Sequence, residues 1–176
     1  MNLQPGADES LDLMMRGRVK LLQSKKGYRT SVDAMMLAWF AWTQAPHAQR
    51  VADFGAGSGL VALTLALVSR PPELTLVERQ QSLATRAHRN LKLNAVSGTV
   101  RHHDLAEGPV PGLHDLDLAM SNPPYFTASG RILPTHPERR DAHYESSAGV
   151  ETFCAAAAAA LGEAGVLCMV YPVEGL

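Results

Sequence analysis

The sequence predicts an α/β fold, built on a mostly parallel sheet with helices on both faces. From residue 50 onward, short apolar segments typical of buried strands alternate with longer segments of helical periodicity. A glycine-rich turn joins the first of these strands to the first helix, and helix-length segments separate most of the later strands. Strands joined in this way run parallel, and their right-handed crossovers place helices on both faces of the sheet.

Composition narrows the class of protein. The chain has 176 residues, of which 46% are hydrophobic and 19% charged, which predicts one compact domain. The longest apolar runs, Leu60 to Val68 and Ala155 to Leu161, are roughly half as long as a membrane span, and no secretion signal is recognisable. The two cysteines, Cys154 and Cys168, lie in apolar stretches. We therefore expect a cytoplasmic protein that contacts no membrane and whose cysteines are reduced core residues.

The N-terminal region carries weaker signals. Residues 1–15 open with a polar stretch and are expected to be a flexible N-terminus, which leaves residues 16–176 as the single domain. Val19–Gln23 and Tyr28–Arg29 are predicted to form a short hairpin around Gly27.

A helix is predicted from Asp33 to about Trp42, with Ser31 as its N-cap. Its large side chains recur near helical spacing and are interpreted as packing residues: Met35, Met36, Trp39 and Phe40.

The rest of the chain alternates between strands and helices and ends in a fifth strand. The predicted strands are Arg50–Phe54, Leu74–Glu78, Thr99–Asp104, Leu116–Ser121 and Val166–Tyr171, and the predicted helices are Leu60–Ser69, Gln80–Asn94 and Val150–Leu161. Residues 127 to 149 form a long polar segment with little periodicity.

Charge is unevenly distributed, although the net charge is only −1. One stretch near the N-terminus is basic and has no acidic residue; it contains Arg16, Arg18, Lys20, Lys25, Lys26 and Arg29. Such a run is either a solvated face or a patch that contacts phosphates, and both interpretations stay open.

The glycine-rich turn predicts a nucleoside site. Gly55, Gly57 and Gly59 alternate with other residues between a strand and a helix, where a missing side chain lets a ligand approach the helix N-terminus. Glu78 ends the next strand, about 20 residues beyond the turn, where an acid can accept hydrogen bonds from ribose hydroxyls.

The spacing of the glycines also distinguishes between two candidate cofactors. A dinucleotide fold uses the order G-x-G-x-x-G, whereas this chain has G-x-G-x-G, and the preceding Asp53 would repel a pyrophosphate but suit a cationic amine or sulfonium. S-adenosylmethionine therefore fits better than a nicotinamide dinucleotide. Asp104, at the end of the third strand, lies where such a site would meet the adenine amino group, or else it is a surface cap. No histidine or cysteine cluster has metal-ligand spacing, so no metal is expected.

A second motif, Asn122-Pro123-Pro124-Tyr125, follows the fourth strand at the carboxyl edge of the predicted sheet. Two prolines fix the backbone and remove N–H donors, so nearby carbonyls are free to face a ligand. An amide, a carbonyl and an aromatic ring in one rigid turn can bind an amino group while the ring stacks on a planar base.

These motifs together resemble class I S-adenosylmethionine-dependent methyltransferases of the N6-adenine type. Within that class the chain is similar to the bacterial tRNA1(Val) adenine-37 N6-methyltransferase family, with support from the segments Gly27–Asp33 and Arg139–Glu145. The resemblance spans roughly residues 16 to 172 and implies a Rossmann-like fold, S-adenosylmethionine as cofactor and tRNA as partner.

The resemblance also implies roles for individual residues. Asn122 Oδ1 and the Pro123 carbonyl would accept the two protons of the target amino group, and Tyr125 would stack on the base. The expected cofactor-binding residues are Asp53, Gly55, Ala56, Gly57, Gly59, Glu78, Asp104 and Asn122, and the expected substrate-binding residues are Tyr125, Phe126, Arg29, Arg139 and Arg140.

Other functions stay open on the sequence alone. Glutamine in protein release factors is methylated through the same tetrad, and DNA adenine or a ribosomal base is a further candidate substrate. A nicotinamide oxidoreductase is the alternative enzyme class. The resemblance further implies two strands after the fifth, so the chain ending at Leu176 is expected to be C-terminally incomplete, with an exposed edge strand, and a non-catalytic RNA- or partner-binding fragment is the remaining alternative.

Overall fold

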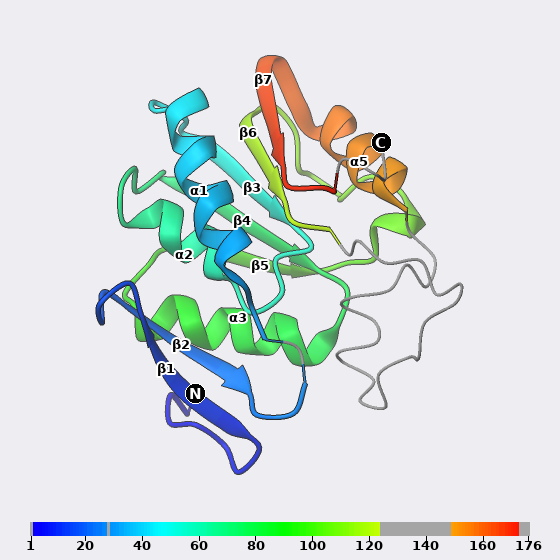
Figure 1. The fold of residues 1–176 in the computed structure, drawn as a ribbon. Coiled ribbons are helices and arrows are strands. Elements are labelled where there is room, and N and C mark those ends of the chain that lie inside the picture. The colour runs from blue at the N-terminus through cyan, green and yellow to red at the C-terminus, as the bar shows by residue number, and fades with distance from the viewer. Residues whose placement is uncertain (1, 28, 124–148, 173–176) are drawn as a thin grey trace.

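The computed structural model describes residues 2–27, 29–123 and 149–172, which form a two-stranded hairpin and a five-stranded sheet flanked by helices (Figure 1). The strands are β1 (Glu9–Met14), β2 (Val19–Ser24), β3 (Arg50–Phe54), β4 (Glu73–Glu78), β5 (Thr99–His102), β6 (Leu116–Ser121) and β7 (Leu161–Met169). The helices are α1 (Val32–Gln44), α2 (Leu60–Ala66), α3 (Gln81–Leu93), the 3-10 helix η1 (Leu105–Glu107) and α5 (Val150–Ala160).

All neighbouring strands of the larger sheet run parallel, in the order β5-β4-β3-β6-β7. The chain moves outward from β3 to β4 and β5, and then crosses to the other side of β3 for β6 and β7. The strand order therefore reverses beside β3. Open parallel sheets bind ligands outside the carboxyl ends of the strands at such a reversal. The predicted fold class is confirmed.

The two faces of the sheet bury different side chains, as the two-residue period of a strand requires. Val51 and Leu76 point into a core shared with α1, α2 and α3. Ala52 and Val77, their neighbours in sequence, point into a second core with α5 and η1. Figure 1 shows α1, α2 and α3 on one side of the sheet and α5 on the other. None of the helices in the described part of the chain has the length and apolar character needed to cross a membrane.

The N-terminal hairpin differs from the prediction. β1 pairs with β2 in antiparallel register, from Glu9 opposite Ser24 to Met14 opposite Val19, so the expected hairpin around Gly27 is wrong. Its turn lies at residues 15–18, where Gly17 has a φ of +83°. β1 occupies part of the segment that we expected to be a flexible N-terminus, because it pairs with β2 and because its half-buried Glu9 forms salt bridges with Arg86 and Arg89 of α3.

The first helix packs differently from its predicted pattern. Its buried face is made of small residues and one leucine: Ala34, Leu37, Ala38 and Ala41. Met36, Trp39 and Phe40, which we interpreted as packing residues, are exposed on the opposite face, so that interpretation is wrong for these three. Small side chains let α1 approach α2 closely, and this leaves the bulky residues outside.

The last strand begins earlier than predicted. β7 starts at Leu161, directly after α5, and not at Val166. A Cβ added to Gly165 would lie 2.4 Å from the carbonyl oxygen of Leu116, so glycine is required for the close approach to β6. Cys168 is buried as expected, but Cys154 is exposed, because α5 turns Phe153 and its neighbouring alanines toward the core.

Candidate functional site

The carboxyl ends of β3, β4 and β6 bring together the three segments that the sequence singled out. Phe54, the last residue of β3, is in register with Val77 of β4 on one side and Ser121 of β6 on the other. The glycine turn follows Phe54, Glu78 follows Val77, and Asn122 follows Ser121. The parallel register therefore sets one side chain or loop from each strand at the same edge.

The glycine turn needs glycine at each of its three positions. Gly55, Gly57 and Gly59 have φ angles of +72°, +56° and +87°, in the left-handed region that other residues rarely adopt. The amides of Gly55 and Ala56 both donate to the carbonyl oxygen of Val77, at 2.9 and 3.0 Å. Gly59 then caps α2. The turn is thereby fastened to β4 before the helix starts.

Close packing excludes side chains at two of these positions. A Cβ on Gly55 would lie 2.9 Å from the ring of Phe153 in α5, and one on Gly59 would lie 3.1 Å from a methyl group of Leu76. Phe153 is therefore the residue that supports the turn from the second core. Sequence reasoning did not single it out, because a phenylalanine in an alanine-rich helix shows no pattern beyond ordinary packing.

Glu78 connects β4 to both neighbouring loops. Its Oε2 accepts a hydrogen bond from the amide of Gly57 at 2.9 Å, and its Oε1 accepts one from the amide of Gln80 at 2.7 Å. Burial raises the pKa of Glu78, and these amides act in the opposite direction. Each carboxylate oxygen has a second lone pair, so the group can still accept hydrogen bonds from a ligand.

Asp53 is a buried carboxyl with no hydrogen-bond partner on either oxygen. Its pKa is raised to about 7: burial is the largest cause and the charge of Glu78 adds to it, whereas the backbone amide of Ala62 in the first turn of α2, which is near but outside hydrogen-bond geometry, acts in the opposite direction. Two neighbouring carboxyl groups in a dry site favour a cationic ligand. This arrangement agrees with the expectation that the turn suits an amine or sulfonium.

Asn122 stands at the end of β6 beside the glycine turn. Its Oδ1 is buried and has no hydrogen-bond partner. The preceding Ser121 donates through Oγ to the carbonyl oxygen of Phe54 at 2.9 Å, and its own carbonyl accepts from the amide of Val170 at 3.2 Å. Pro123, which follows, is buried. The side-chain oxygen of Asn122 is therefore a buried acceptor without a donor. The hydrogen bonds that Ser121 forms with Phe54 and Val170 fix the backbone directly before it.

Two other predicted site residues already have structural partners. Asp104 Oδ1 accepts a hydrogen bond from the amide of Ala106 at 3.0 Å and caps η1. Arg29 forms a salt bridge with Asp12 and also donates to Ser10 Oγ at 3.0 Å. These contacts hold Asp104 and Arg29 in place, and the role of each toward a ligand remains a prediction. Tyr125, Phe126, Arg139 and Arg140 lie outside the described residues.

The basic run near the N-terminus is divided by the hairpin. Arg16 and Arg18 lie at the turn before β2, whereas Lys25 and Arg29 follow its far end. A strand of six residues spans about 20 Å, so the two groups do not form one compact cluster. Lys25 also donates to the carbonyl oxygen of Ala7.

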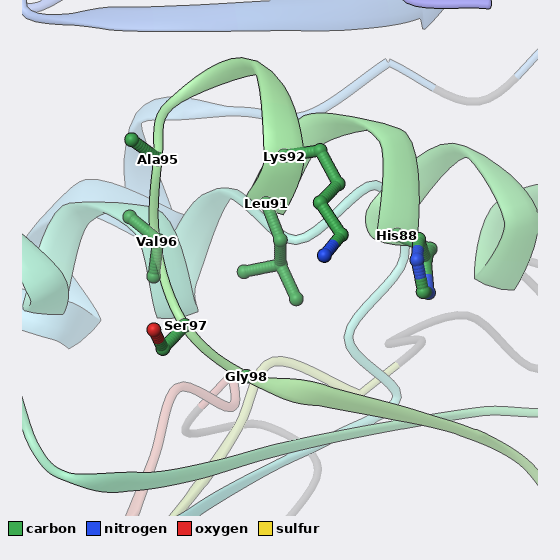
Figure 2. A pocket seen from close by; sticks show the side chains of 7 residues that line it. All are labelled: His88, Leu91, Lys92, Ala95, Val96, Ser97 and Gly98. Atoms are coloured by element: carbon green, nitrogen blue, oxygen red, sulfur yellow. The ribbon is translucent and has the colours of Figure 1, made fainter. Parts of the chain in front are cut away.

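A shallow hollow lies away from this edge of the sheet. It has a volume of about 250 Å³ and is lined by His88, Leu91, Lys92, Ala95, Val96, Ser97 and Gly98 (Figure 2). Because Gly98 precedes β5, the hollow lies at the amino end of the strands, opposite the glycine turn. Across the described residues, no group of three or more His, Cys, Asp or Glu side chains could hold a metal ion.

Sequence reasoning missed Asn90, which is fully buried in α3 and contacts both the hairpin and the glycine turn. A signal for it was present. Asn90 recurs at helical spacing with Leu83, Ala87 and Leu91, and a polar residue on an apolar helix face must find hydrogen-bond partners when it is buried.

Comparison with known families adds to this geometry. The family described as "Methyltransferase small domain" matches residues 32–173. The tRNA1(Val) (adenine(37)-N6)-methyltransferase of Yersinia pseudotuberculosis is 33% identical over 150 residues, which cover 83% of this chain and 58% of that protein. The corresponding protein of Erwinia tasmaniensis is 32% identical over 149 residues, with 83% and 59% covered. The chain thus spans less than two thirds of the length of these relatives.

Solved structures share the fold. A 16S rRNA methyltransferase from T. thermophilus, in complex with AdoMet and guanosine, has a TM-score of 0.66 at 20% identity, covering 92% of this chain and 41% of that one. Trm5b from Pyrococcus abyssi has a TM-score of 0.60 at 16% identity, covering 91% and 39%.

Proposed function

Because this chain belongs to the methyltransferase small domain family, we propose that it transfers a methyl group from S-adenosylmethionine to an exocyclic amino nitrogen, N6 of adenine in a tRNA. The observation that carries the proposal is the buried Oδ1 of Asn122, which has no partner and follows the strand beside the glycine turn. Buried acceptors in proteins are almost always hydrogen-bonded, so this one calls for a donor from a ligand. The amino group of a base is such a donor.

The residues at the glycine turn fit the cofactor. S-adenosylmethionine, when bound, supplies an electrophilic methyl group on a positively charged sulfonium. Glu78, and Asp53 once a cationic ligand has favoured its ionised form, would supply negative charge where they are shielded from water, and both oxygens of Asp53 lack hydrogen-bond partners. The positive φ angles of Gly55, Gly57 and Gly59 turn the backbone sharply between β3 and α2, at the edge of the sheet where a nucleoside would approach.

Asn122 and Pro123 would then activate the nucleophile. The lone pair of the adenine amino group is delocalised into the ring, which makes the nitrogen a poor nucleophile. Hydrogen bonds from its two protons to Asn122 Oδ1 and the Pro123 carbonyl strengthen as positive charge develops on nitrogen, so they stabilise the transition state more than the ground state. Tyr125 would hold the ring by stacking.

The relatives' names support tRNA as the macromolecule, since both relatives described above are tRNA adenine-N6 methyltransferases. A base in a loop is also cheaper to expose than one in a duplex, which favours a tRNA loop as target.

Two experiments test cofactor binding and methyl transfer to the substrate separately. Calorimetry on the full chain should detect binding of S-adenosylmethionine and not of NAD. Unmodified tRNA1(Val) transcript, incubated with the protein and deuterium-labelled methyl donor, should then yield labelled N6-methyladenosine by nucleoside mass spectrometry.

Three control arms decide the substrate class. A transcript with guanine at position 37 should remain unlabelled. If the label were found on glutamine in a release factor, or on adenine in DNA, that macromolecule and not tRNA would be the substrate. Binding of the cofactor with no labelled product on any arm would contradict the proposed activity of this chain.

A further inference from the structure

Asn90 lies between two parts of the molecule that are far apart in sequence. It is fully buried in α3, and each hydrogen-bonding group of its side chain is used. Oδ1 accepts from the amide of Leu22 at 2.8 Å, and Nδ2 donates to the carbonyl of Leu22 at 3.1 Å and to the carbonyl of Ser58 at 2.9 Å. An asparagine amide offers two donors on nitrogen, so both are engaged. One side chain thereby joins β2 to the glycine turn.

Asn94, the C-cap of α3 four residues after Asn90, repeats half of this arrangement. Its Oδ1 accepts from the amide of Lys20 at 2.8 Å, and its Nδ2 donates to the carbonyl of Lys20 at 2.7 Å. The two asparagines thus pair with alternate residues of β2, as a neighbouring strand would. Residues four apart on a helix and two apart on a strand have similar spacings, which is why the pairing fits.

The hairpin is fixed to α3 at its other strand as well. Glu9 in β1 accepts hydrogen bonds from Arg86 at 3.0 Å and from Arg89 at 2.7 Å. Burial raises the pKa of Glu9, but the amide of Gly6 and the two guanidinium groups outweigh it and hold the pKa below its usual value. Both strands of the hairpin are therefore bonded to α3. Asn90 and Asn94 both hold β2, but Asn90 also donates a hydrogen bond to Ser58.

We infer that Asn90 is a positioning residue for the cofactor: it fixes the carbonyl of Ser58, and so the glycine turn, and it couples that turn to the docking of the N-terminal hairpin. The inference rests on the proposed function, because it assigns the turn to S-adenosylmethionine. Ser58 lies between Gly57, whose amide is held by Glu78, and Gly59, which caps α2. Without the Asn90 donor, Ser58 would keep a buried carbonyl with one partner fewer, and the turn between these two anchors would be freer to move.

The test compares Asn90→Ala with Asn94→Ala. Both substitutions remove two hydrogen bonds to the backbone of β2, but only the first removes the bond to Ser58. Loss of a buried hydrogen bond predicts about tenfold weaker binding of S-adenosylmethionine to Asn90→Ala by calorimetry. Asn94→Ala loosens the hairpin but keeps the bond to Ser58, so it should weaken cofactor binding clearly less than Asn90→Ala does.

Hydrogen exchange provides a readout without cofactor. The amides of Gly59 and Gly57, which are bonded within the site, should exchange faster in Asn90→Ala than in Asn94→Ala. If Asn90→Ala does not fold, Asn90→Asp carries the same comparison, because it keeps an acceptor for Leu22 but has no amide donor for Ser58.

Two results would overturn the inference. One is equal cofactor affinity in the wild type and the Asn90 variants, and the other is the same loss in Asn94→Ala as in Asn90→Ala. Absence of cofactor binding by the wild type would instead contradict the proposed function, so the two failures are distinguishable. Glu9→Gln, which loosens the hairpin at β1, should weaken cofactor binding when it is introduced into the wild type but not when it is introduced into Asn90→Ala. An equal loss of affinity in both backgrounds would show that Asn90 does not couple the hairpin to the glycine turn.

Discussion

Ser121 donates a hydrogen bond of 2.9 Å through its hydroxyl to the carbonyl oxygen of Phe54, and both residues are fully buried. Phe54 is the last residue before the glycine turn, and Ser121 is the last before Asn122. This bond joins the ends of two neighbouring strands where the proposed cofactor and target base would meet. It therefore fixes the distance between the turn and the asparagine more tightly than backbone pairing alone.

Ser121→Ala should slow methyl transfer while leaving cofactor affinity nearly unchanged. The bond holds Asn122 relative to the glycine turn, and misplacement by about 1 Å can cost on the order of a hundredfold in rate. Single-turnover kinetics with saturating S-adenosylmethionine measure this step, and calorimetry measures affinity. Ser97→Ala, in the hollow at the opposite edge of the sheet, is the matched control. A rate equal to that of the wild type would show that the bond has no positioning role.

Asn122→Ala should lower the rate of methyl transfer by at least about a hundredfold, because it removes an acceptor for the developing positive charge on nitrogen. The affinity for S-adenosylmethionine should barely change. Asn122→Asp keeps the shape and an acceptor oxygen, and should lose less activity than the alanine variant. Nucleoside mass spectrometry over a time course gives both rates. Similar rates for Asn122→Ala and the wild type would exclude the proposed contact with the amino group.

Much of this edge of the sheet could be predicted from local sequence. The glycine turn, Glu78 and Asn122 each lie at the end of a strand with a strong apolar pattern, and parallel strands bring their carboxyl ends together. Both ends of β3 and of β6 were predicted to the residue.

What could not be predicted depends on contacts between distant segments. β1 needs Arg86 and Arg89, about eighty residues away, to hold Glu9, and the residues of this short strand show no sign of such partners. The exposed Trp39 and Phe40 were misinterpreted for a related reason. The spacing of apolar residues in α1 allows either of two helix faces to be the buried one. Which face is buried depends on how closely the small residues can approach α2.

Glu78→Gln should weaken binding of S-adenosylmethionine about tenfold or more. The glutamine keeps one oxygen, so only one of the bonds to Gly57 and Gln80 survives, and the negative charge is lost. Glu73→Gln, at the exposed amino end of the same strand, is the matched control and should bind the cofactor normally. Calorimetry at constant pH measures both. Unchanged affinity in Glu78→Gln would rule out the assignment of Glu78 to the ribose.

The buried carboxyl of Asp53 predicts that the stability of the fold and the affinity for the cofactor depend on pH in opposite directions. In the folded protein its pKa is about 7, above the ordinary value of 3.8, so the folded state holds a proton that the unfolded chain releases between these values. The free energy of unfolding should therefore decrease as pH rises from about 4 to 7 and level off above 7. Asp53→Asn removes this loss, so its Tm should exceed that of the wild type at pH 8 by more than at pH 5.

Cofactor binding should respond to pH in the other direction. A cationic ligand favours the ionised form of Asp53, so the affinity of the wild type for S-adenosylmethionine should rise between pH 6 and 8, by at most about tenfold per pH unit below the pKa. Asp53→Asn should bind more weakly and with a flatter profile, with Glu78 contributing what dependence remains. Scanning calorimetry and titration calorimetry at matched pH values measure the two effects. An unchanged pH profile in Asp53→Asn would mean that this buried carboxyl does not face the cationic part of the cofactor.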